Sequence, residues 1–211
     1  MRLYIRPIAP NALKVLIFMA ERGIEVETVD VGDLAPEEYA RVSPLKAVPV
    51  LETDGGLFVT ESLTICQYLD ATAPGPSLFG DGPEERAVVA MWERRAEQRL
   101  VEPAIEFGHH TQPMFAGRLD QYPDWARSNA ERSAPMLALM EARLAESRFL
   151  AGEAFTMADL TAFLGWAGLV GWRAIEPRPG PALGRWLGEV GGRPSMAPLR
   201  ALAAQFGLPS V

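Results

Sequence analysis

Residues 48–62 of the chain read VPVLETDGGLFVTES, and this stretch decides the fold of the first part of the protein. Two short apolar runs, residues 48–51 and 57–59, flank the turn residues Thr53-Asp54-Gly55-Gly56. Apolar runs on either side of such a turn are typical of a β-hairpin. Thr60 follows as a favourable helix N-cap residue. The stretch therefore predicts two strands and then a helix that runs to about Leu69.

The residues before this stretch alternate between strand-like and helix-like patterns. Short apolar runs predict strands at residues 3–5 and 25–31, and apolar residues at helical spacing predict helices at 11–22 and 36–42. Gly23 follows the first of these helices as a C-cap residue. The predicted order β-α-β-α-β-β-α is typical of one compact α/β unit.

The residues after this stretch have a different pattern. Proline and glycine are frequent from Ala73 to Pro83, which predicts a linker. Beyond it, apolar spacing predicts helices only, at residues 84–107, 123–147, 157–170, 181–190 and 196–205. We therefore predict an α/β domain at residues 1–78, a linker at 79–85 and an all-helical domain at 86–211.

Composition argues against nucleic-acid binding, against disulfide and thiolate zinc sites, and against a membrane span. The 211 residues are 48% hydrophobic and 22% charged, as in ordinary globular proteins. The net charge of −7 disfavours binding to nucleic acid, because the surface repels phosphates. A single cysteine allows no internal disulfide and no thiolate zinc site, which fits a cytoplasmic protein. No run is long and apolar enough to predict a membrane span.

Four short motifs occur along the chain in a recognisable order. They are Val48-Pro49-Val50-Leu51, Glu61-Ser62, the segment FTMADL at residues 155–160, and Arg193-Pro194-Ser195. Together they resemble the cytosolic glutathione transferase family over essentially the whole chain. The resemblance implies a thioredoxin-like first domain that binds glutathione and a helical second domain that forms the pocket for a hydrophobic electrophile. It also implies a homodimer, a role in detoxification and no metal.

The resemblance assigns the glutathione site to five residues. Val48 and Pro49 would form a cis peptide whose Val48 backbone pairs with the cysteinyl backbone of glutathione, although a proline at the start of a strand has a purely structural explanation too. Ser62 would bind the γ-glutamyl carboxylate at a helix N-terminus, and Glu61 would bind the ammonium group. Lys46 is the candidate for the glycine carboxylate. The family often has a cation one position later, where this chain has Ala47.

The position that activates the thiol departs from the family. A common pattern there is Ser-Pro-Asn-Ser-x-Lys-Val, whereas residues 9–15 of this chain read APNALKV. Both serine positions, Ala9 and Ala12, have lost the hydroxyl donor. Three explanations remain open. Asn11 donates to the thiolate with the free N–H groups of the first helical turn, catalysis has been lost, or Tyr4 on the first strand is the donor.

The remaining predictions concern the helical part and one cysteine. Phe107, His110 and Trp166 are predicted to line the electrophile pocket. The alternative for each is burial in the core or a place at a solvated helix end. His109 and His110 have no further histidine beside them to complete a metal site. Thr156 to Asp159 is predicted to be a capping box with Phe155 and Leu160 as a hydrophobic staple. Cys66 lies in an apolar helix and is predicted to be a buried small hydrophobe.

The same residues allow a second function. The two alanines at positions 9 and 12 are what a non-catalytic glutathione-binding or protein-interaction module of this fold would have. The presence of Val48-Pro49 and Glu61-Ser62 argues for glutathione binding in either case.

Overall fold

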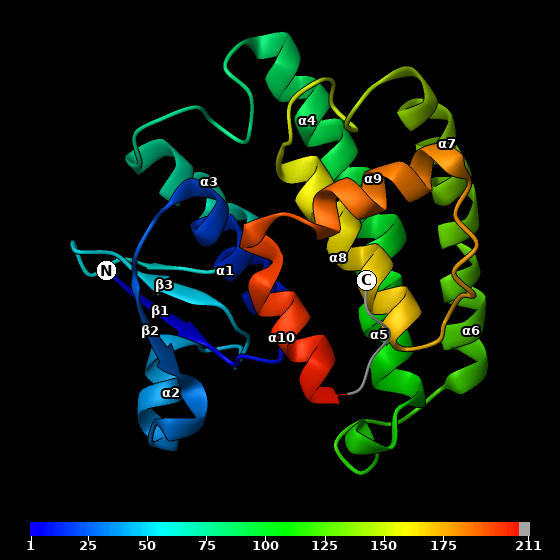
Figure 1. Ribbon diagram of the computed structural model, residues 1–211. Helices are drawn as coiled ribbons and strands as arrows, with labels where there is room; N and C mark the ends of the chain where they lie inside the picture. The colour runs from blue at the N-terminus through cyan, green and yellow to red at the C-terminus, as the bar shows by residue number, and fades with distance from the viewer. Residues whose placement is uncertain (207–211) are drawn as a thin grey trace. The chain divides into compact units, whose positions relative to one another are not determined.

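The structure, a computed structural model, describes residues 1–206 (Figure 1). Contacts between Cα atoms divide it into two compact units. The first consists of Met1–Ser77 and Pro194–Leu202, and the second of Leu78–Arg193 with the described residues 203–206. The domain boundaries predicted from the sequence assign residues 194–202 to the helical domain, whereas the structure places them in the first unit. Periodicity identifies a helix near residue 200, but it carries no information about the unit in which that helix packs.

The first unit is built on a sheet of four strands in the order β2-β1-β3-β4. Its elements are β1 (Arg2–Ile5), α1 (Pro10–Arg22), β2 (Glu27–Asp30), α2 (Pro36–Val42), β3 (Val50–Glu52), β4 (Phe58–Val59) and α3 (Ser62–Thr72). β1 and β2 are parallel, which requires the crossover helix α1, whereas β3 is antiparallel to both β1 and β4. This confirms the predicted element order and the thioredoxin-like α/β arrangement. A 3₁₀ turn at Val31–Asp33 was not predicted.

Local sequence explains where the first helix begins and ends. Pro10 occupies the first helical turn, where its missing N–H costs nothing. Gly23 ends the helix in the left-handed conformation, with φ of 63°, as predicted for a C-cap. Cys66 is completely buried in α3, as predicted.

Two polar contacts hold distant segments onto α1. The guanidinium of Arg22 forms a buried ion pair with Asp70 at 3.0 Å and donates hydrogen bonds to the backbone carbonyls of Ala73, Pro74 and Pro76. Ser195, in the 3₁₀ turn Pro194–Met196, donates a hydrogen bond of 2.6 Å to Glu21. The first contact fixes the end of α3, and the second fixes the returning C-terminal segment.

The second unit is helical. Its elements are α4 (Pro83–Ala96), α5 (Glu102–Thr111), α6 (Pro123–Glu131), α7 (Ser133–Glu146), α8 (Met157–Gly171) and α9 (Pro181–Gly191), and α10 (Ala197–Phe206) begins in the first unit. The helix predicted at 84–107 is interrupted by a π-helical turn at Glu97–Val101. Pro103 follows this turn; a proline cannot donate to the carbonyl one turn earlier, so a widened turn accommodates it. The helix predicted at 123–147 is divided at Arg132.

α8 is the central helix of this unit and packs against α4, α5 and α9 (Figure 1). Nearly all of its residues are buried, as expected for a helix that is apolar on every side. Gly165 permits a close approach, because a Cβ there would lie 2.5 Å from the Cβ of Leu100. No helix of the described residues is long and apolar enough to cross a membrane.

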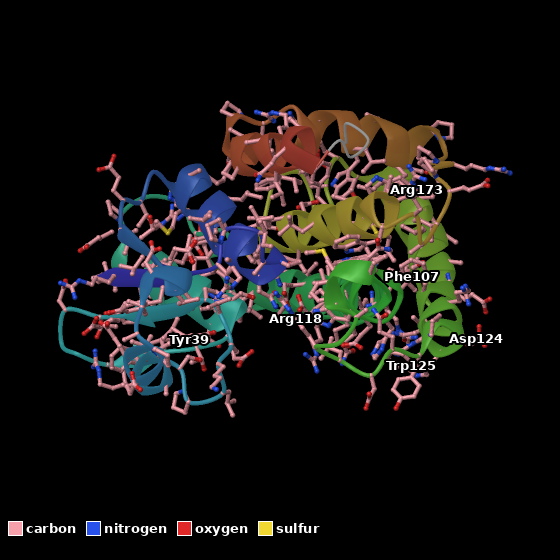
Figure 2. All side chains as sticks on the ribbon, turned by 90° about the horizontal axis from the view of Figure 1, so that it is seen from below. Tyr39, Phe107, Arg118, Asp124, Trp125 and Arg173 are labelled. Carbon is pink, nitrogen blue, oxygen red and sulfur yellow. The ribbon has the colours of Figure 1, made fainter. Side chains whose placement is uncertain are left out.

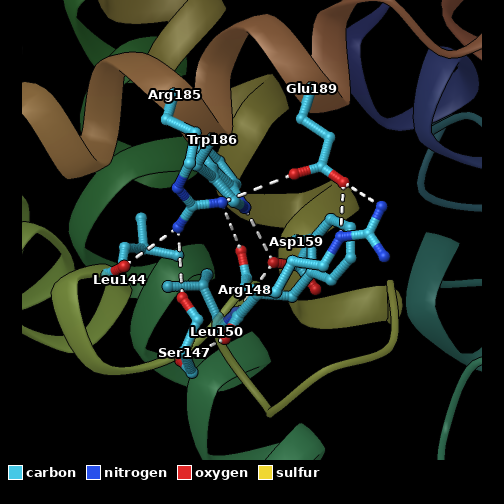
Figure 3. A network of polar contacts seen from close by, with 9 residues as sticks. Leu144, Ser147, Arg148, Leu150, Asp159, Arg185, Trp186 and Glu189 are labelled. Carbon is cyan, nitrogen blue, oxygen red and sulfur yellow. Dashed lines mark hydrogen bonds and ion pairs between the residues drawn. The ribbon is translucent and has the colours of Figure 1, made fainter.

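The start of α8 is held by a buried carboxylate. Asp159 accepts hydrogen bonds from the backbone N–H of Thr156 and its hydroxyl, both at 3.1 Å, which confirms the predicted capping box. It also accepts bonds of 2.9 Å from the backbone N–H of Leu150 and the indole of Trp186 (Figure 3). One side chain therefore joins the start of α8, the preceding loop and α9.

Charged side chains of α9 extend this network. The guanidinium of Arg185 donates to the carbonyls of Leu144, Ser147 and Arg148, at the C-terminus of α7 (Figure 3). A cation at that position interacts favourably with the helix dipole. In the opposite direction, Glu141 of α7 accepts hydrogen bonds from the first backbone N–H groups of α9.

Candidate functional site

The loop before β3 contains the predicted cis peptide between Val48 and Pro49. Ser43 is buried, and its hydroxyl bonds both the N–H and the C=O of Ala47 at 2.9 and 2.8 Å. The Tyr39 hydroxyl donates to the carbonyl of Lys46 at 2.6 Å. Among residues 1–206, no hydrogen bond reaches the backbone N–H or C=O of Val48. These hydrogen bonds hold the loop through Lys46 and Ala47. The backbone N–H and C=O of Val48 therefore remain available to a ligand.

Lys46 lies at the turn of this loop. Its φ of 52° is in the left-handed region, and its side chain is exposed. The exposure is what a cation needs to meet a carboxylate from solution. It is equally compatible with a solvated side chain, so the role of Lys46 stays a prediction.

The N-terminus of α3 has unpaired donors. Glu61 is its N-cap residue, with an unusual φ of 65° and no side-chain hydrogen bond to the helix. Ile65 is the first residue of the helix whose N–H bonds back, to the carbonyl of Glu61. In the described part of the chain, the N–H groups of Ser62 and Leu63 have no partner. Such a helix start favours an anion.

The N-terminus of α1 is similar and lies against this one. Ala9 is its N-cap residue and provides no side-chain bond. Within residues 1–206, the backbone N–H groups of Asn11 and Ala12 also lack partners. The Ser62 hydroxyl donates a hydrogen bond of 3.2 Å to the side-chain oxygen of Asn11. The structure thus brings together two residues, 51 positions apart, that sequence reasoning assigned to the thiol and to the carboxylate.

Tyr4 lies elsewhere. It is buried with Val31, Val42 and Val50, and its hydroxyl donates to Glu52 at 2.7 Å. Burial raises the pKa of the Tyr4 phenol, and the hydrogen bond to Glu52 raises it further. A phenol in this setting packs in the core, and because its hydroxyl already donates to Glu52 it is poorly suited to support a nearby thiolate.

The three predicted electrophile-pocket residues all lie in the helical unit. Phe107 on α5 and Trp166 on α8 are buried. His110 is half-buried, and with Tyr122 and Trp125 it lines an open cavity of about 420 Å³. The structure brings His110 together with these two aromatic residues, and Phe107 and Trp166 do not line that cavity. Figure 2 labels Phe107 and Trp125.

Two polar contacts hold the His110 ring. Its Nδ1 accepts from the backbone N–H of Tyr122 at 3.3 Å, and its Nε2 lies 3.2 Å from the Glu106 carboxylate. His109 instead packs edge-on against Phe115. Within residues 1–206, no group of three or more His, Cys, Asp or Glu side chains is arranged to hold a metal.

Comparison with known proteins identifies the family to which this chain is similar. Residues 3–77 match the family model described as the N-terminal domain of glutathione S-transferase. A probable glutathione S-transferase of rice, GSTF2 (Oryza sativa subsp. japonica), is 33% identical over 76% of this chain and 77% of its own. Glutathione S-transferase 2 of Saccharomyces cerevisiae is 29% identical over 94% of this chain and 89% of its own.

A solved structure extends the match to both units. A glutathione S-transferase domain-containing protein from Marinobacter aquaeolei aligns with a TM-score of 0.86 and 35% identity, over 93% of this chain and 100% of its own. The chain belongs to the glutathione S-transferase family. The resemblance identified from the four sequence motifs is thereby confirmed.

Sequence reasoning missed several parts of this glutathione transferase. Ser43 and Tyr39, which hold the loop before Pro49, carry no motif; their only signal is their place in and just after a short helix. Tyr122 and Trp125 gave no signal as partners of His110, because an aromatic residue near a helix start is common. The hydrogen bond between Asn11 and Ser62 could not be read from residues so far apart in the chain.

Proposed function

We propose that this glutathione transferase binds glutathione in its first unit and promotes attack of the thiolate on a hydrophobic electrophile. The observation that carries the proposal is the hydrogen bond between Asn11 and Ser62. It joins two helix N-termini whose first N–H groups have no partner among the described residues. Two adjoining anion sites suit a ligand that has both a carboxylate and a thiolate.

Glutathione is proposed to bind along this surface in an extended form. The Val48 backbone pairs with the cysteinyl backbone in the manner of an added strand. The N-terminus of α3 at Ser62 takes the γ-glutamyl carboxylate, and Glu61 takes the ammonium group. Lys46 is proposed to meet the glycine carboxylate at the other end.

The thiol is proposed to be ionised by neutral donors rather than by a serine hydroxyl. A free thiol has a pKa of about 8.5, so at neutral pH most of it is protonated. Hydrogen bonds to the thiolate lower that pKa, and a helix N-terminus adds to the effect. The side-chain NH₂ group of Asn11 is available, since its only hydrogen bond in the described residues uses the amide oxygen. The backbone N–H groups of Asn11 and Ala12 provide further donors.

The electrophile is proposed to be hydrophobic and to contact the helical unit. His110, with Tyr122 and Trp125, supplies an aromatic surface for it. Contacts of Phe107 and Trp166 with the electrophile stay predictions. We also propose that the protein works in the cytoplasm as a homodimer without a metal, and a sedimentation measurement of the molecular mass tests the dimer.

Titration calorimetry with glutathione near pH 7, in two buffers of different ionisation enthalpy, tests the proposal. It measures affinity and released protons together. Binding with proton release supports thiol ionisation, and turnover of 1-chloro-2,4-dinitrobenzene then tests the transfer itself. Asn11→Ala should reduce turnover far more than affinity for glutathione.

A second function is favoured by Ala9 and Ala12, which lack the family's hydroxyl donor. It is a non-catalytic glutathione-binding or protein-interaction module. Binding without proton release and without turnover would support it. No binding at all would refute the assignments of Val48, Glu61 and Ser62 and leave the protein-interaction module.

A further inference from the structure

The side chain of Asn11 can support a thiolate in only one of its two orientations. Its amide has an acceptor on one side and two N–H donors on the other. With the NH₂ group toward the sulfur it stabilises the negative charge. With the oxygen toward the sulfur it repels that charge. Something must therefore choose between two orientations of nearly equal shape.

Ser62 makes that choice in the structure. Its hydroxyl donates to the amide oxygen of Asn11 at 3.2 Å, and Ser62 itself is 8% exposed. The oxygen is thereby fixed on the side of α3. The NH₂ group faces away from Ser62 and has no hydrogen-bond partner among residues 1–206.

We propose that Ser62 is a positioning residue for thiol activation, because its hydroxyl orients the Asn11 amide with the NH₂ group toward the glutathione sulfur. This inference rests on the proposed function. It gives Ser62 a role beyond binding of the γ-glutamyl carboxylate.

A count of protons separates this role from carboxylate binding. The Ser62 hydroxyl has a single proton, which it can donate either to Asn11 or to a carboxylate at any one time. The carboxylate has other donors, since the backbone N–H groups of Ser62 and Leu63 are unpaired in the described part of the chain. Asn11 has no other hydrogen-bond donor to its oxygen there. The hydroxyl proton is therefore needed more at Asn11 than at the carboxylate.

The test measures the pKa of the bound thiol and the affinity for glutathione separately. Thiolate absorbance in the ultraviolet, followed against pH at saturating glutathione, gives the first; calorimetry gives the second. For Ser62→Ala we expect the bound thiol pKa to rise by about one unit, or roughly tenfold less thiolate below that pKa. Affinity should change by less than about threefold, because the backbone donors remain.

Three further variants make the result specific. Asn11→Asp keeps the acceptor for Ser62 and removes the donor, so it should raise the thiol pKa at least as much as Ser62→Ala. In an Asn11→Ala background, Ser62→Ala should cause no further rise, because the residue it orients is gone. Ser62→Thr keeps the hydroxyl and should stay close to the parent protein. Circular dichroism of each variant confirms that the fold is intact.

Other outcomes overturn the inference in distinguishable ways. An unchanged thiol pKa in Ser62→Ala with glutathione affinity reduced tenfold or more would mean that the hydroxyl serves the carboxylate. Equal pKa shifts in the parent and Asn11→Ala backgrounds would mean that Ser62 acts without Asn11. Failure of the parent protein to bind glutathione or to ionise its thiol would refute the proposed function itself, and this inference with it.

Discussion

Replacement of Asp159 by alanine should destabilise the helical unit severely. The carboxylate is completely buried and accepts hydrogen bonds from the N–H of Leu150 and the indole of Trp186 (Figure 3). It accepts two more from the N–H and the hydroxyl of Thr156. Alanine would leave three buried N–H donors without an acceptor, at about 1–3 kcal/mol each. Because the bonds share one acceptor and water can partly replace it, we expect a loss of about 3–5 kcal/mol. That is a large part of the roughly 5–15 kcal/mol that stabilises an ordinary domain.

Urea denaturation followed by tryptophan fluorescence measures this loss of stability in the helical unit. All five tryptophans, at positions 92, 125, 166, 172 and 186, belong to the helical unit. Asp159→Asn keeps one acceptor oxygen and should cost less, about 1–2 kcal/mol. Glu153→Ala, an exposed carboxylate in the same loop, should change stability by less than about 0.5 kcal/mol. If Asp159→Ala were no more harmful than Glu153→Ala, the carboxylate would not be holding these elements together.

The pH dependence of the free energy of unfolding shows whether burial or hydrogen bonding dominates the pKa of Asp159. Burial raises the pKa of the Asp159 carboxyl, and the hydrogen bonds from Leu150, Trp186 and Thr156 oppose the rise. The folded protein therefore keeps this proton to a higher pH than the unfolded chain does. The stability of the parent protein relative to Asp159→Asn should fall as pH rises from about 4, the unfolded pKa, and level off above the folded pKa. A difference that grew with pH would show that the hydrogen bonds prevail over burial.

The remaining predictions concern helix packing and capping in the same unit. Gly165→Ala would place a Cβ 2.5 Å from that of Leu100 and 2.9 Å from its backbone, and should cost about 1–3 kcal/mol or more in urea denaturation. Gly184→Ala, in α9 with nothing within 4 Å, should instead stabilise by about 0.4–1 kcal/mol, and similar effects of the two would refute the close approach. Glu141→Ala removes the acceptor for the first N–H groups of α9 and should cost about 0.5–2 kcal/mol, whereas Glu141→Gln should retain part of the stability.

The sequence predicts most of the elements, because their signals are local. Gly23 ends α1, the Asp54-Gly55 turn forms the hairpin, and the Thr156–Asp159 box starts α8, each as a contact within a few residues. The interruption of the long helix before Pro103 was missed, since apolar spacing continues through it.

The candidate site is less accessible to sequence reasoning, because it depends on contacts between distant residues. Val48, Glu61 and Ser62 were chosen through motifs, but the bond from Ser62 to Asn11 requires the packing of α1 on α3. Likewise, Asp159 was expected only to cap its own helix. Its hydrogen bond to Trp186 spans 27 residues and has no local signal.

The return of residues 194–202 to the first unit has a consequence for how the protein is made. Ser195 and Glu21 are separated by 174 residues, so at synthesis rates of about 5–20 residues per second the partner of Glu21 follows it by roughly 10–35 s. During that interval the first unit exists with one side of α1 uncovered. A fragment that ends near Ser77 would remain in that incomplete state permanently, and adding residues 194–202 as a separate peptide should protect it from proteolysis.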